Sequence, residues 1–395
     1  MEIILLTVED SIAKSSINIE NELHKDLSYT SGQILSSMNS EPLGRDIFSK
    51  YIHTNLGDPA LFRGTKKIEK HVIKILGGFV QLPPSGDGII VSGGSEANIT
   101  ALWAMRNNKI PDYLEHKDIP EVIVPESIHI SIEKAANLLG IRLKKIPSTS
   151  KYQIDLSQTK KSISERTIGI VGVAGTTALG VIDPLKELND ICLNYDLFFH
   201  IDAAFGGLVL PFLPDTRNRF HFSFELEAVK SITIDIHKMG RVASPGGGLL
   251  WRDRSYCKAI QFTLKYLEGR PKQNTITGTR SGASAITFAS IWQNLGFEGF
   301  RKSVLTCIEN TKFLAEEFSK RGFYIPIEPV INILGVKTSN NYPIDINILH
   351  QKLWELGWTT TIVDGFLRFV IMPPTSKAHL LKLMDIIDKI MNVKS

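Results

Sequence analysis

The sequence predicts an α/β protein whose central sheet is mostly parallel and is covered by helices on both faces. Five short apolar runs, at 89–91, 122–124, 168–173, 197–201 and 232–236, are typical of strands buried on both sides. Segments with helical spacing of apolar residues lie between most of these runs. Alternation of buried strands with helices indicates parallel connections.

The expected helices follow the strands in order along the chain. Thr65 is a candidate N-cap for a helix that runs through Leu76. A helix at 127–139 is expected to end at Gly140, because glycine suits a left-handed C-cap. The other elements expected in this part are helices at 96–107 and 185–193 and strands at 141–146 and 248–251.

Near Thr279 the pattern changes to long helices with a few short strands, which indicates a smaller α+β domain. We therefore predict an N-terminal segment at 1–60, a large domain at 61–280 and a small C-terminal domain at 281–395. The small domain is expected to hold helices at 283–295, 301–321, 344–356 and 376–392 and strands at 331–336 and 367–371.

Composition excludes several classes of protein. The 395-residue chain carries 45 basic and 41 acidic residues, and a net charge of +4 gives no reason to expect nucleic-acid binding. Cys192, Cys257 and Cys307 are odd in number and far apart, which predicts no disulfide framework or metal site and fits a reducing compartment. The apolar start at 3–6 is too short for a signal segment, and no apolar run approaches transmembrane length. We expect a cytoplasmic protein without membrane contact.

The run 232–236 is followed directly by His237 and Lys238. A lysine at the end of a buried parallel strand is costly unless it is neutral, paired or covalently bound. Desolvation generally turns an amine into a usable nucleophile, as in lysines that form a Schiff base. The alternative is a solvated charge at a strand end, and other parts of the chain are needed to decide.

Two further loops follow predicted strands, at the edge where open α/β sheets bind ligands. Residues 92–95 (Ser-Gly-Gly-Ser) precede a helix, so their glycines and free N–H groups suit an anion such as phosphate, as well as an ordinary turn. Asp202 ends the strand at 197–201, and a buried carboxylate there needs a cation unless it caps the next turn. The small Ala203 and Ala204 leave room beside it for a flat group.

His129 lies at the start of the helix expected at 127–139, where it would either stack on a ring or stay on the surface. An anion loop, Asp202, a stacking histidine and Lys238 together describe pyridoxal phosphate. The helix start takes the phosphate, the carboxylate keeps the pyridine nitrogen protonated, and the lysine holds the aldehyde as an imine. The sequence therefore predicts pyridoxal phosphate as the cofactor of the large domain.

Seven motifs occur in the order of one known family. They are Gly-Asp-Pro-Ala-Leu-Phe (57–62), Ser-Gly-Gly-Ser-Glu-Ala-Asn (92–98), Gly-Ile-Val-Gly-Val-Ala-Gly-Thr-Thr (169–177), His-Ile-Asp-Ala-Ala-Phe-Gly-Gly (200–207), Ser-Ile-Thr-Ile-Asp-Ile-His-Lys-Met (231–239), Thr-Gly-Thr-Arg-Ser-Gly-Ala (277–283) and Leu-Arg-Phe-Val-Ile-Met-Pro (367–373). They resemble the group II pyridoxal-phosphate decarboxylases, and most of all the archaeal L-tyrosine/L-aspartate decarboxylase family. The resemblance runs from about Asn21 to Met391 and implies a fold-type I homodimer with shared active sites.

The resemblance also implies roles for individual residues. Lys238 would be the Schiff-base lysine, Asp202 the partner of the pyridinium, and His129 the stacking ring. Arg368 would hold the substrate α-carboxylate, a bidentate role that suits arginine. Thr279 would reach the phosphate of the neighbouring subunit. Further cofactor contacts are implied for Gly94, Ser95, Thr176, Ala204, Asp235 and His237.

The chain departs from the family in two substrate-side loops. Residues 39–44 read Asn-Ser-Glu-Pro-Leu-Gly where the family has Cys-Thr-x-Pro-His-Pro, and Arg63 replaces a proline. Arg45 follows the first altered loop and Arg63 lies in the second, so both are candidates for the substrate pocket. Two guanidiniums near its mouth would suit an acidic side chain, although both could be surface charges.

We therefore expect an L-amino-acid α-decarboxylase that releases CO₂ and an amine. L-Aspartate is the favoured substrate, followed by glutamate or cysteine sulfinate, and L-tyrosine is the main alternative. Lys238 is the expected donor of the returning proton. One alternative is a carbon–carbon lyase that resembles sphingosine-phosphate lyase, against which Arg368 argues because such substrates lack an α-carboxylate. The other is a scaffold that keeps the fold without turnover, against which the intact Lys238, Asp202 and His129 argue.

Overall fold

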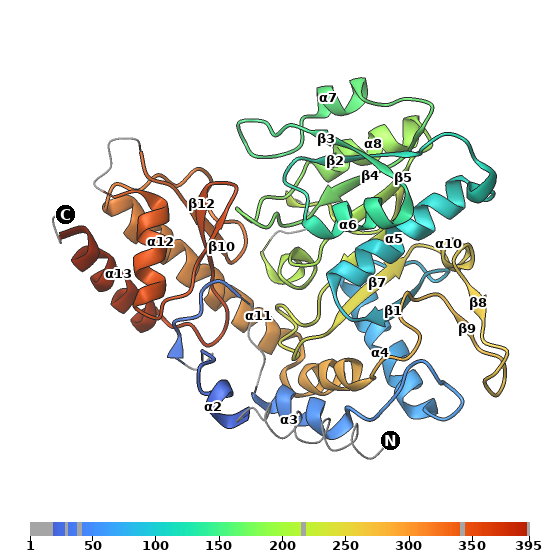
Figure 1. The fold of residues 1–395 in the computed structure, drawn as a ribbon, viewed down its shortest axis with the longest axis horizontal. Helices are drawn as coiled ribbons and strands as arrows, with labels where there is room; N and C mark the ends of the chain where they lie inside the picture. Colours follow the sequence, from blue (N-terminus) through green and yellow to red (C-terminus); the bar gives the residue numbers. More distant parts are fainter. Residues whose placement is uncertain (1–18, 28–30, 38–41, 215–218, 340–343, 393–395) are drawn as a thin grey trace, which may run out of the picture.

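A computed structural model describes residues 19–27, 31–37, 42–214, 219–339 and 344–392 (Figure 1). The altered residues 39–41 and the apolar start at 3–6 lie outside this part of the chain, whereas Pro42 and Gly44 belong to a helix. Figure 1 shows a large α/β body and a smaller C-terminal body, with a long helix, α11, running between them. Within the described residues, no helix combines the length and apolar character that crossing a membrane requires.

The large body is built on a seven-stranded sheet in the order β1-β7-β6-β5-β4-β2-β3. Six strands run in one direction, and β7 pairs antiparallel with both β6 and β1. The predicted fold class, a mostly parallel sheet of the fold-type I kind, is therefore confirmed. The strands are β1 (Asp87–Val91), β2 (Glu121–Pro125), β3 (Arg142–Ile146), β4 (Thr167–Val173), β5 (Phe198–Asp202), β6 (Val229–Ile234) and β7 (Gly247–Trp251).

Helices cover both faces of this sheet, and the strand residues alternate between two cores. Ile123 and Ile170 pack into one core with α4 and α8, whereas Val124 and Val171 pack into another with α5 and α6. The helices of this body are α4 (Arg63–Phe79), α5 (Gly94–Lys109), α6 (Ile130–Leu139), α7 (Leu156–Lys161), α8 (Leu185–Asn194) and α10 (Arg254–Lys258). A small hairpin, β8 (Phe262–Thr263) and β9 (Lys272–Gln273), projects from it.

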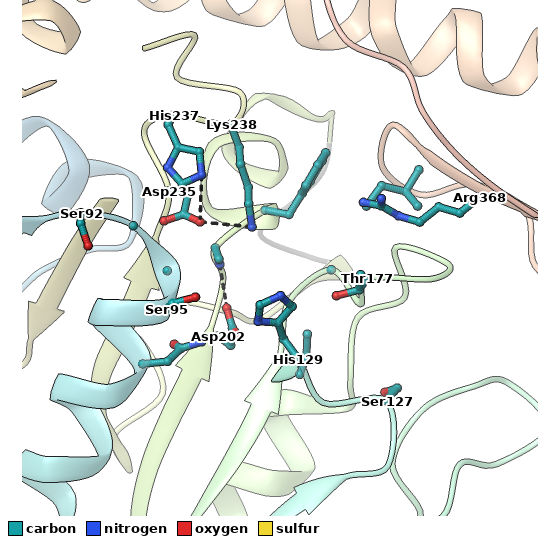
Figure 2. Close-up of a pocket in the computed structure, with 18 residues that line it drawn as sticks. Ser92, Ser95, Ser127, His129, Thr177, Asp202, Asp235, His237, Lys238 and Arg368 are labelled. Carbon is teal, nitrogen blue, oxygen red and sulfur yellow. Dashed lines mark hydrogen bonds and ion pairs between the residues drawn. The ribbon is translucent and has the colours of Figure 1, made fainter. Parts of the chain in front are cut away.

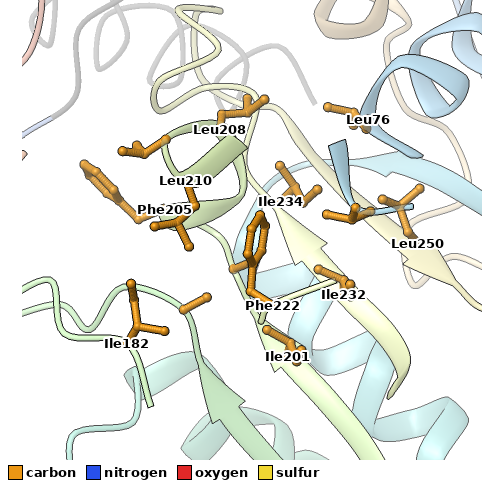
Figure 3. Close-up of a cluster of buried hydrophobic side chains, with 14 of the residues drawn as sticks. Leu76, Ile182, Ile201, Phe205, Leu208, Leu210, Phe222, Ile232, Ile234 and Leu250 are labelled. Carbon is orange, nitrogen blue, oxygen red and sulfur yellow. The ribbon is translucent and has the colours of Figure 1, made fainter. Parts of the chain in front are cut away.

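The same alternation on β6 connects the core to the cavity described below. Ile232 and Ile234 lie in the apolar cluster with Leu76 of α4 and Leu250 of β7, as Figure 3 shows. Thr233, between them, points to the other face, where it bonds a side chain of α5. One strand therefore anchors the sheet in its core and supplies a polar group to the opposite face.

Of two helix caps predicted from the sequence, the structure confirms one and contradicts the other. Gly140 ends α6 with a left-handed φ of 65°, as expected. Thr65 is not an N-cap, because α4 begins at Arg63 and Phe62 takes the cap position without a side-chain hydrogen bond. α6 begins at Ile130, so His129 is itself the capping residue.

The C-terminal body packs around a core of its own that contains Phe318, Phe369 and Leu383. The two helices expected at 283–321 form one long element, α11 (Ala283–Lys320), which is kinked at Gly296 (φ 59°, ψ −173°). The remaining elements are β10 (Ile333–Val336), α12 (Ile346–Glu355), β11 (Thr361–Val363), β12 (Phe366–Val370) and α13 (Lys377–Asn392), with the strands ordered β10-β12-β11.

The described part of the N-terminal segment divides between the two bodies. Leu35 is buried in the C-terminal core, donates its N–H to Thr359 and accepts from Val370. α3 (Pro42–Tyr51) instead packs on α11, and α2 (Ile19–Leu23) precedes both contacts. The division of the chain into 1–60, 61–280 and 281–395 stays a prediction.

Candidate active site

A cavity of about 390 Å³ lies at the carboxyl ends of β4, β5 and β6, and Ile333 and Arg368 of the C-terminal body also line it. Parallel strands bring their following loops to one edge, so residues far apart in sequence meet there. Figure 2 shows Lys238, His129 and Arg368 directed into this space from different elements. The predicted site residues that line it are Gly94, Ser95, His129, Asp202, Ala204, Asp235, His237, Lys238 and Arg368.

Lys238 lies in the turn that follows β6, four residues beyond its last residue, Ile234. Its Nζ is 3.2 Å from Asp235 Oδ2 and 6.0 Å from the centre of the Phe205 ring. The side chain is 23% exposed and lines the cavity. The strand-end lysine is thus paired and partly desolvated instead of standing free in solvent.

Asp235 and His237 belong to the same turn. Asp235 is 2% exposed; its Oδ2 lies 3.2 Å from Lys238 Nζ and 3.9 Å from His237 Nε2, whereas its Oδ1 has no hydrogen-bond partner among the described residues. The other ring nitrogen of His237 bonds the Gly246 carbonyl oxygen, which fixes the ring orientation. A buried oxygen without a partner indicates a site that is completed by a further group.

The start of α5 forms a cradle beside this turn. A Cβ atom at Gly94 would lie 2.8 Å from Asp235 Oδ2, and one at Gly93, where φ is 153°, would lie 3.1 Å from His237 Cε1. The first N–H groups of the 16-residue helix have no acceptor within the helix. Glycines therefore keep open a space where N–H groups meet an imidazole, which suits a phosphate.

The carboxylate of Glu96 holds this cradle in place through hydrogen bonds to Ser92 and Thr277. Its carboxylate accepts the Ser92 N–H at 2.8 Å and both the N–H and the hydroxyl of Thr277, at 3.2 and 2.9 Å. Burial alone would raise the pKa of Glu96, but these hydrogen bonds outweigh it and the pKa is lowered. Glu96 thereby joins the loop at 92–95 to the loop that leads to Thr279.

Asp202 is the last residue of β5 and is 6% exposed. Both oxygens of its carboxylate accept hydrogen bonds from the protein. Oδ1 accepts the Ala204 N–H at 3.0 Å, and Oδ2 accepts the side-chain amide of Asn98 at 2.8 Å. Asn98 lies in the second turn of α5 and is itself 1% exposed. It was not singled out in the sequence, because an asparagine inside a helix gives no sign of what it bonds.

His129 caps α6 and faces the cavity (Figure 2). Its Nδ1 accepts the backbone N–H of Ser131 at 3.2 Å and lies 2.9 Å from the Ser131 hydroxyl. Although the ring is accessible from the cavity, the protein behind it desolvates it and lowers its pKa; Asp202 and Asp235 act in the opposite direction. The neutral ring therefore carries its proton on Nε2.

Arg368 reaches the cavity from β12 of the C-terminal body and is only 8% exposed. Nη1 donates to the Ser36 carbonyl at 3.3 Å, and Nε has no hydrogen-bond partner among the described residues. Burial without a neighbouring carboxylate lowers the pKa of this guanidinium to about 10, so it stays charged at neutral pH. A buried cation with unused donors suits a carboxylate ligand.

Four predicted residues do not line the cavity. The Thr176 hydroxyl accepts the Val181 N–H at 3.0 Å, within its own loop, and the adjacent Thr177 lines the cavity in its place. Thr279, Arg45 and Arg63 are exposed on this chain. Lining residues that were not predicted include Ser127, Gly175, Phe205 and Ile333, of which Gly175 and Phe205 lie in the motifs already quoted.

The arrangement fits pyridoxal phosphate at three independent points. The glycine cradle beside His237 has the size and donors for a phosphate, and the fixed carboxylate of Asp202 suits a protonated ring nitrogen. The amine of Lys238 is accessible to an aldehyde. Arg368 remains for a second anionic group, which an amino-acid substrate carries as its α-carboxylate.

Comparison with known proteins gives a consistent result. The family model described as the pyridoxal-dependent decarboxylase conserved domain matches residues 8–336. A protein of Methanothermobacter thermautotrophicus named "Probable L-tyrosine/L-aspartate decarboxylase" is 41% identical over 359 residues, which cover 90% of this chain and 96% of the relative. The L-aspartate decarboxylase of Thermococcus kodakarensis is 41% identical over 373 residues and 92% of each chain.

Solved structures share the fold at lower identity. Glutamate decarboxylase of Lactobacillus brevis superimposes with a TM-score of 0.87 at 21% identity, over 95% of this chain and 91% of that one. A sphingosine-1-phosphate lyase of Burkholderia pseudomallei gives 0.82 at 21% identity, over 98% and 91%. Both are similar in fold to this chain, and similarity at this level does not separate a decarboxylase from a lyase.

Proposed function

We propose, from the premise that the chain belongs to the pyridoxal-dependent decarboxylase family, that its cavity removes the α-carboxylate of an acidic L-amino acid. Membership makes the protein a pyridoxal-phosphate-dependent amino-acid decarboxylase, so the expected carboxy-lyase activity and cofactor are confirmed. Relatives at 41% identity bear decarboxylase names, which disfavours the lyase and scaffold readings.

The residues of the cavity would divide the work as follows. Gly94, Ser95 and His237 would hold the phosphate, Asp202 the ring nitrogen and His129 the ring face. Lys238 would bond the aldehyde and later yield that position to the substrate amine. When bound, pyridoxal phosphate supplies the electron sink that takes up the electron pair left by departing CO₂.

The observation that carries the proposal is the unsatisfied guanidinium of Arg368. Among the described residues, Nε has no hydrogen-bond partner and Nη1 has one long bond, to the Ser36 carbonyl, and the residue is 8% exposed. A charge so placed is stabilised when a carboxylate binds it bidentately. Because Arg368 projects from β12 toward the space beside Lys238, it would fix the α-carboxylate of a substrate whose amine lies at the lysine.

Lys238 is also the proposed source of the proton that replaces CO₂ on the α-carbon. Its amine is the cationic group that faces both Asp235 and the apolar Phe205 ring. Asp235 Oδ2, at 3.2 Å from Nζ, would hold the amine in place while the substrate occupies the aldehyde position. Phe205 and Ile333 line the same cavity and would exclude water that could protonate the carbon without control.

For the substrate, we favour L-aspartate, with L-tyrosine as the alternative. Eight relatives bear names that include L-aspartate; two of these names also include L-tyrosine, and one also includes L-glutamate. On the described part of this chain, the cations that line the cavity are Lys238 and Arg368, together with the imidazoles of His129 and His237. A second substrate carboxylate would therefore need a cation from elsewhere, and Arg63 is our candidate.

We further propose a homodimer in which the loop at 57–65 and Thr279 serve the partner's site. Leu61 is 78% exposed, Phe262 is 63% exposed and Ile276 is 46% exposed. The loop at 56–59 and the β8–β9 hairpin line one small cavity, so this apolar surface is formed by neighbouring segments. Exposed apolar surface of this kind is typical of an interface. We expect the dimer in the cytoplasm, where the three buried, unpaired cysteines would stay reduced.

Hybrid dimers test the substrate and the shared site together. Lys238→Ala and Arg63→Ala subunits are each assayed for CO₂ release from aspartate and from tyrosine, and are then mixed and reassembled. If Arg63 acts across the interface, Arg63→Ala loses aspartate turnover and keeps tyrosine turnover. A mixed dimer then regains aspartate turnover, because one of its two sites has both native residues.

Lys67→Ala is the matched control, since Lys67 is an exposed cation on the next turn of α4. It should leave both substrates unaffected. Equal losses for aspartate and tyrosine in Arg63→Ala, or a wild type that prefers tyrosine, would refute the substrate assignment. A fully active monomer in sedimentation would refute the shared site.

A further inference from the structure

Asn98 is the centre of a hydrogen-bond network on the closed side of the cavity. Its amide nitrogen donates to Asp202 Oδ2 at 2.8 Å and to Ser131 Oγ at 2.9 Å. Its amide oxygen accepts from Thr233 Oγ1 at 2.8 Å and lies 3.1 Å from His200 Nε2. A primary amide offers two N–H donors and two oxygen lone pairs, so every hydrogen-bonding position of Asn98 is used.

The partners fix the direction of each bond. The carboxylate of Asp202 accepts, so the amide nitrogen of Asn98 must face it and the amide oxygen must face His200. Because that oxygen can only accept, His200 Nε2 must carry a proton. His200 Nδ1, 2.8 Å from Ser231 Oγ, then accepts the serine hydroxyl proton.

His200 is therefore neutral, and its ring is linked to Asp202 through the side chain of Asn98, which bonds both residues. It is fully buried, and burial lowers its pKa to about 4 despite the nearby carboxylate, which acts in the opposite direction. Asn98 separates the two groups, so Asp202 does not form an ion pair with His200. The negative charge of Asp202 is left for a cation in the cavity.

A second branch of the network reaches His129. Ser131 Oγ accepts one N–H of Asn98 and can then donate its own proton to His129 Nδ1 at 2.9 Å, beside the backbone N–H of Ser131. Two donors at Nδ1 keep the His129 proton on Nε2, the nitrogen on the cavity side. One amide thus orients both groups assigned to the cofactor ring.

We propose that Asn98 is a positioning residue that keeps Asp202 unpaired and oriented and holds His129 and His200 in their Nε2–H forms. Asn98 acts through these neighbours and does not itself bond the cofactor. This inference rests on the roles proposed above for Asp202 and His129. The inference concerns the negative charge of Asp202, since Lys238 pairs with Asp235 and Arg368 bonds Ser36.

The first test reads the imidazole tautomers in the wild-type holoenzyme. Nitrogen-15 NMR of histidine-labelled protein, assigned with His129→Gln and His200→Gln, should show both rings neutral and protonated on Nε2 at pH 7. A charged His200, or a proton on its Nδ1, would overturn the proposal without any variant of Asn98. The readout is independent of turnover.

The second test compares Asn98→Ala with Asn108→Ala. Asn108 lies on the same helix but does not line the cavity, and within the described part of the chain its amide bonds the carbonyls of Ala104 and Tyr256. Asn98→Ala should lower kcat by roughly 10- to 150-fold, the loss expected for one hydrogen bond to a charged group, with KM unchanged because Arg368 is intact. Wild-type kcat in Asn98→Ala, or an equal loss in Asn108→Ala, would overturn the proposal.

Asn98→Asp gives a readout that a purely structural role would not move. It places a carboxylate beside Asp202, and the two must share a proton to stay close. When the proton is present it replaces the amide donor, so turnover should recover as pH falls and decline as pH rises. Asn98→Ala, which has no such proton, should show no added titration, and a wild-type pH profile in Asn98→Asp would refute the role.

Asp202→Asn separates this inference from the function on which it rests. If Asp202→Asn keeps wild-type turnover, the assigned role of Asp202 fails and with it the basis of the inference. If Asp202→Asn is impaired while Asn98→Ala keeps wild-type kcat and tautomers, the role of Asp202 stands and only the proposal for Asn98 is overturned.

Discussion

The two ends of the cavity are built in opposite ways. At the ring-side end, formed by Asn98, His129 and Asp202, the buried amide and carboxylate oxygens and nitrogens all have hydrogen-bond partners within the chain. At the substrate-side end, formed by Arg368, Phe205 and Ile333, the guanidinium Nε has none among the described residues. Burial depresses the pKa of Arg368 because no carboxylate compensates it.

The difference reflects how long each ligand stays. A cofactor that remains bound binds more tightly when its partner side chains are already oriented, because the entropy of ordering them is lost during folding and not on binding. A substrate that must enter and leave on every turnover needs donors that are still unused. The Nε of Arg368, which has no hydrogen-bond partner among the described residues, lines the cavity where a substrate can reach it.

Lys238 lies between the two ends and should give the largest effect. Lys238→Ala should lose the borohydride-reducible bond to the cofactor and lower turnover on the order of 10⁴-fold or more, as when a covalent nucleophile is removed. Mass spectrometry of the reduced protein locates the adduct. Lys230→Ala is the control, since Lys230 is a partly buried lysine that does not line the cavity. An adduct on another lysine would disprove the assignment.

Asp202→Asn tests the ring-side end and should give the next largest effect. The lost charge partner in a buried site is worth roughly 3–5 kcal/mol, a few hundred- to a few thousand-fold in kcat. Cofactor binding should survive, because the cradle at the start of α5 is unchanged. Titration of the apoprotein with cofactor, followed by absorbance, separates the two effects. Near-normal kcat would contradict the proposed role.

Arg368→Gln and Arg368→Met test the substrate-side end, where the effect on catalysis should be smaller. Arg368→Gln should lower kcat/KM by roughly 10- to 150-fold, the equivalent of a hydrogen bond to a charged group, without changing the cofactor spectrum. Arg368→Met should also raise the free energy of unfolding of the apoprotein by about 1 kcal/mol, because it removes a buried charge that lacks a partner. Urea unfolding measures this gain.

Arg321 is the matched control for that comparison. It lies in the same body but is paired with Asp388 at 2.7 Å and with Glu317 at 2.8 Å. Arg321→Gln should lower stability and leave kcat/KM unchanged, the reverse of Arg368→Met. If Arg368→Met destabilises the protein as Arg321→Gln does, the two ends of the cavity do not differ in the way described here.

Much of the site could be predicted, because strand ends carry its chemistry. Asp202 follows β5, Lys238 follows β6, and the glycines at 93 and 94 open α5, so each position is visible from the boundary between an apolar run and a polar residue. The mostly parallel sheet followed from the same pattern. The direction of β7 did not, since its residues form a short apolar run whose orientation depends on its partners β1 and β6.

Other features depend on contacts that a single sequence does not encode locally. Asn98 lies inside a helix, and only the meeting of α5 with β5 and β6 gives it Asp202, His200 and Thr233 as partners. Thr176 and Thr177 are adjacent and chemically alike, and the turn geometry decides which faces the cavity. The position of Arg368 was available only through the family resemblance, because it lies on a strand of the other body.

The N-terminal segment has a consequence for how the site is made. Leu35 bonds Thr359 across 324 positions in the sequence, and the neighbouring Ser36 supplies the carbonyl that Arg368 contacts. At a synthesis rate of about 5–20 residues per second, Thr359 emerges from the ribosome roughly 16–65 s after Leu35. During that interval the large body can form its sheet and its cofactor end, while residues 34–36 have no place to dock. The end of the cavity proposed to bind the substrate α-carboxylate is therefore completed last, when the C-terminal body forms around residues 34–36.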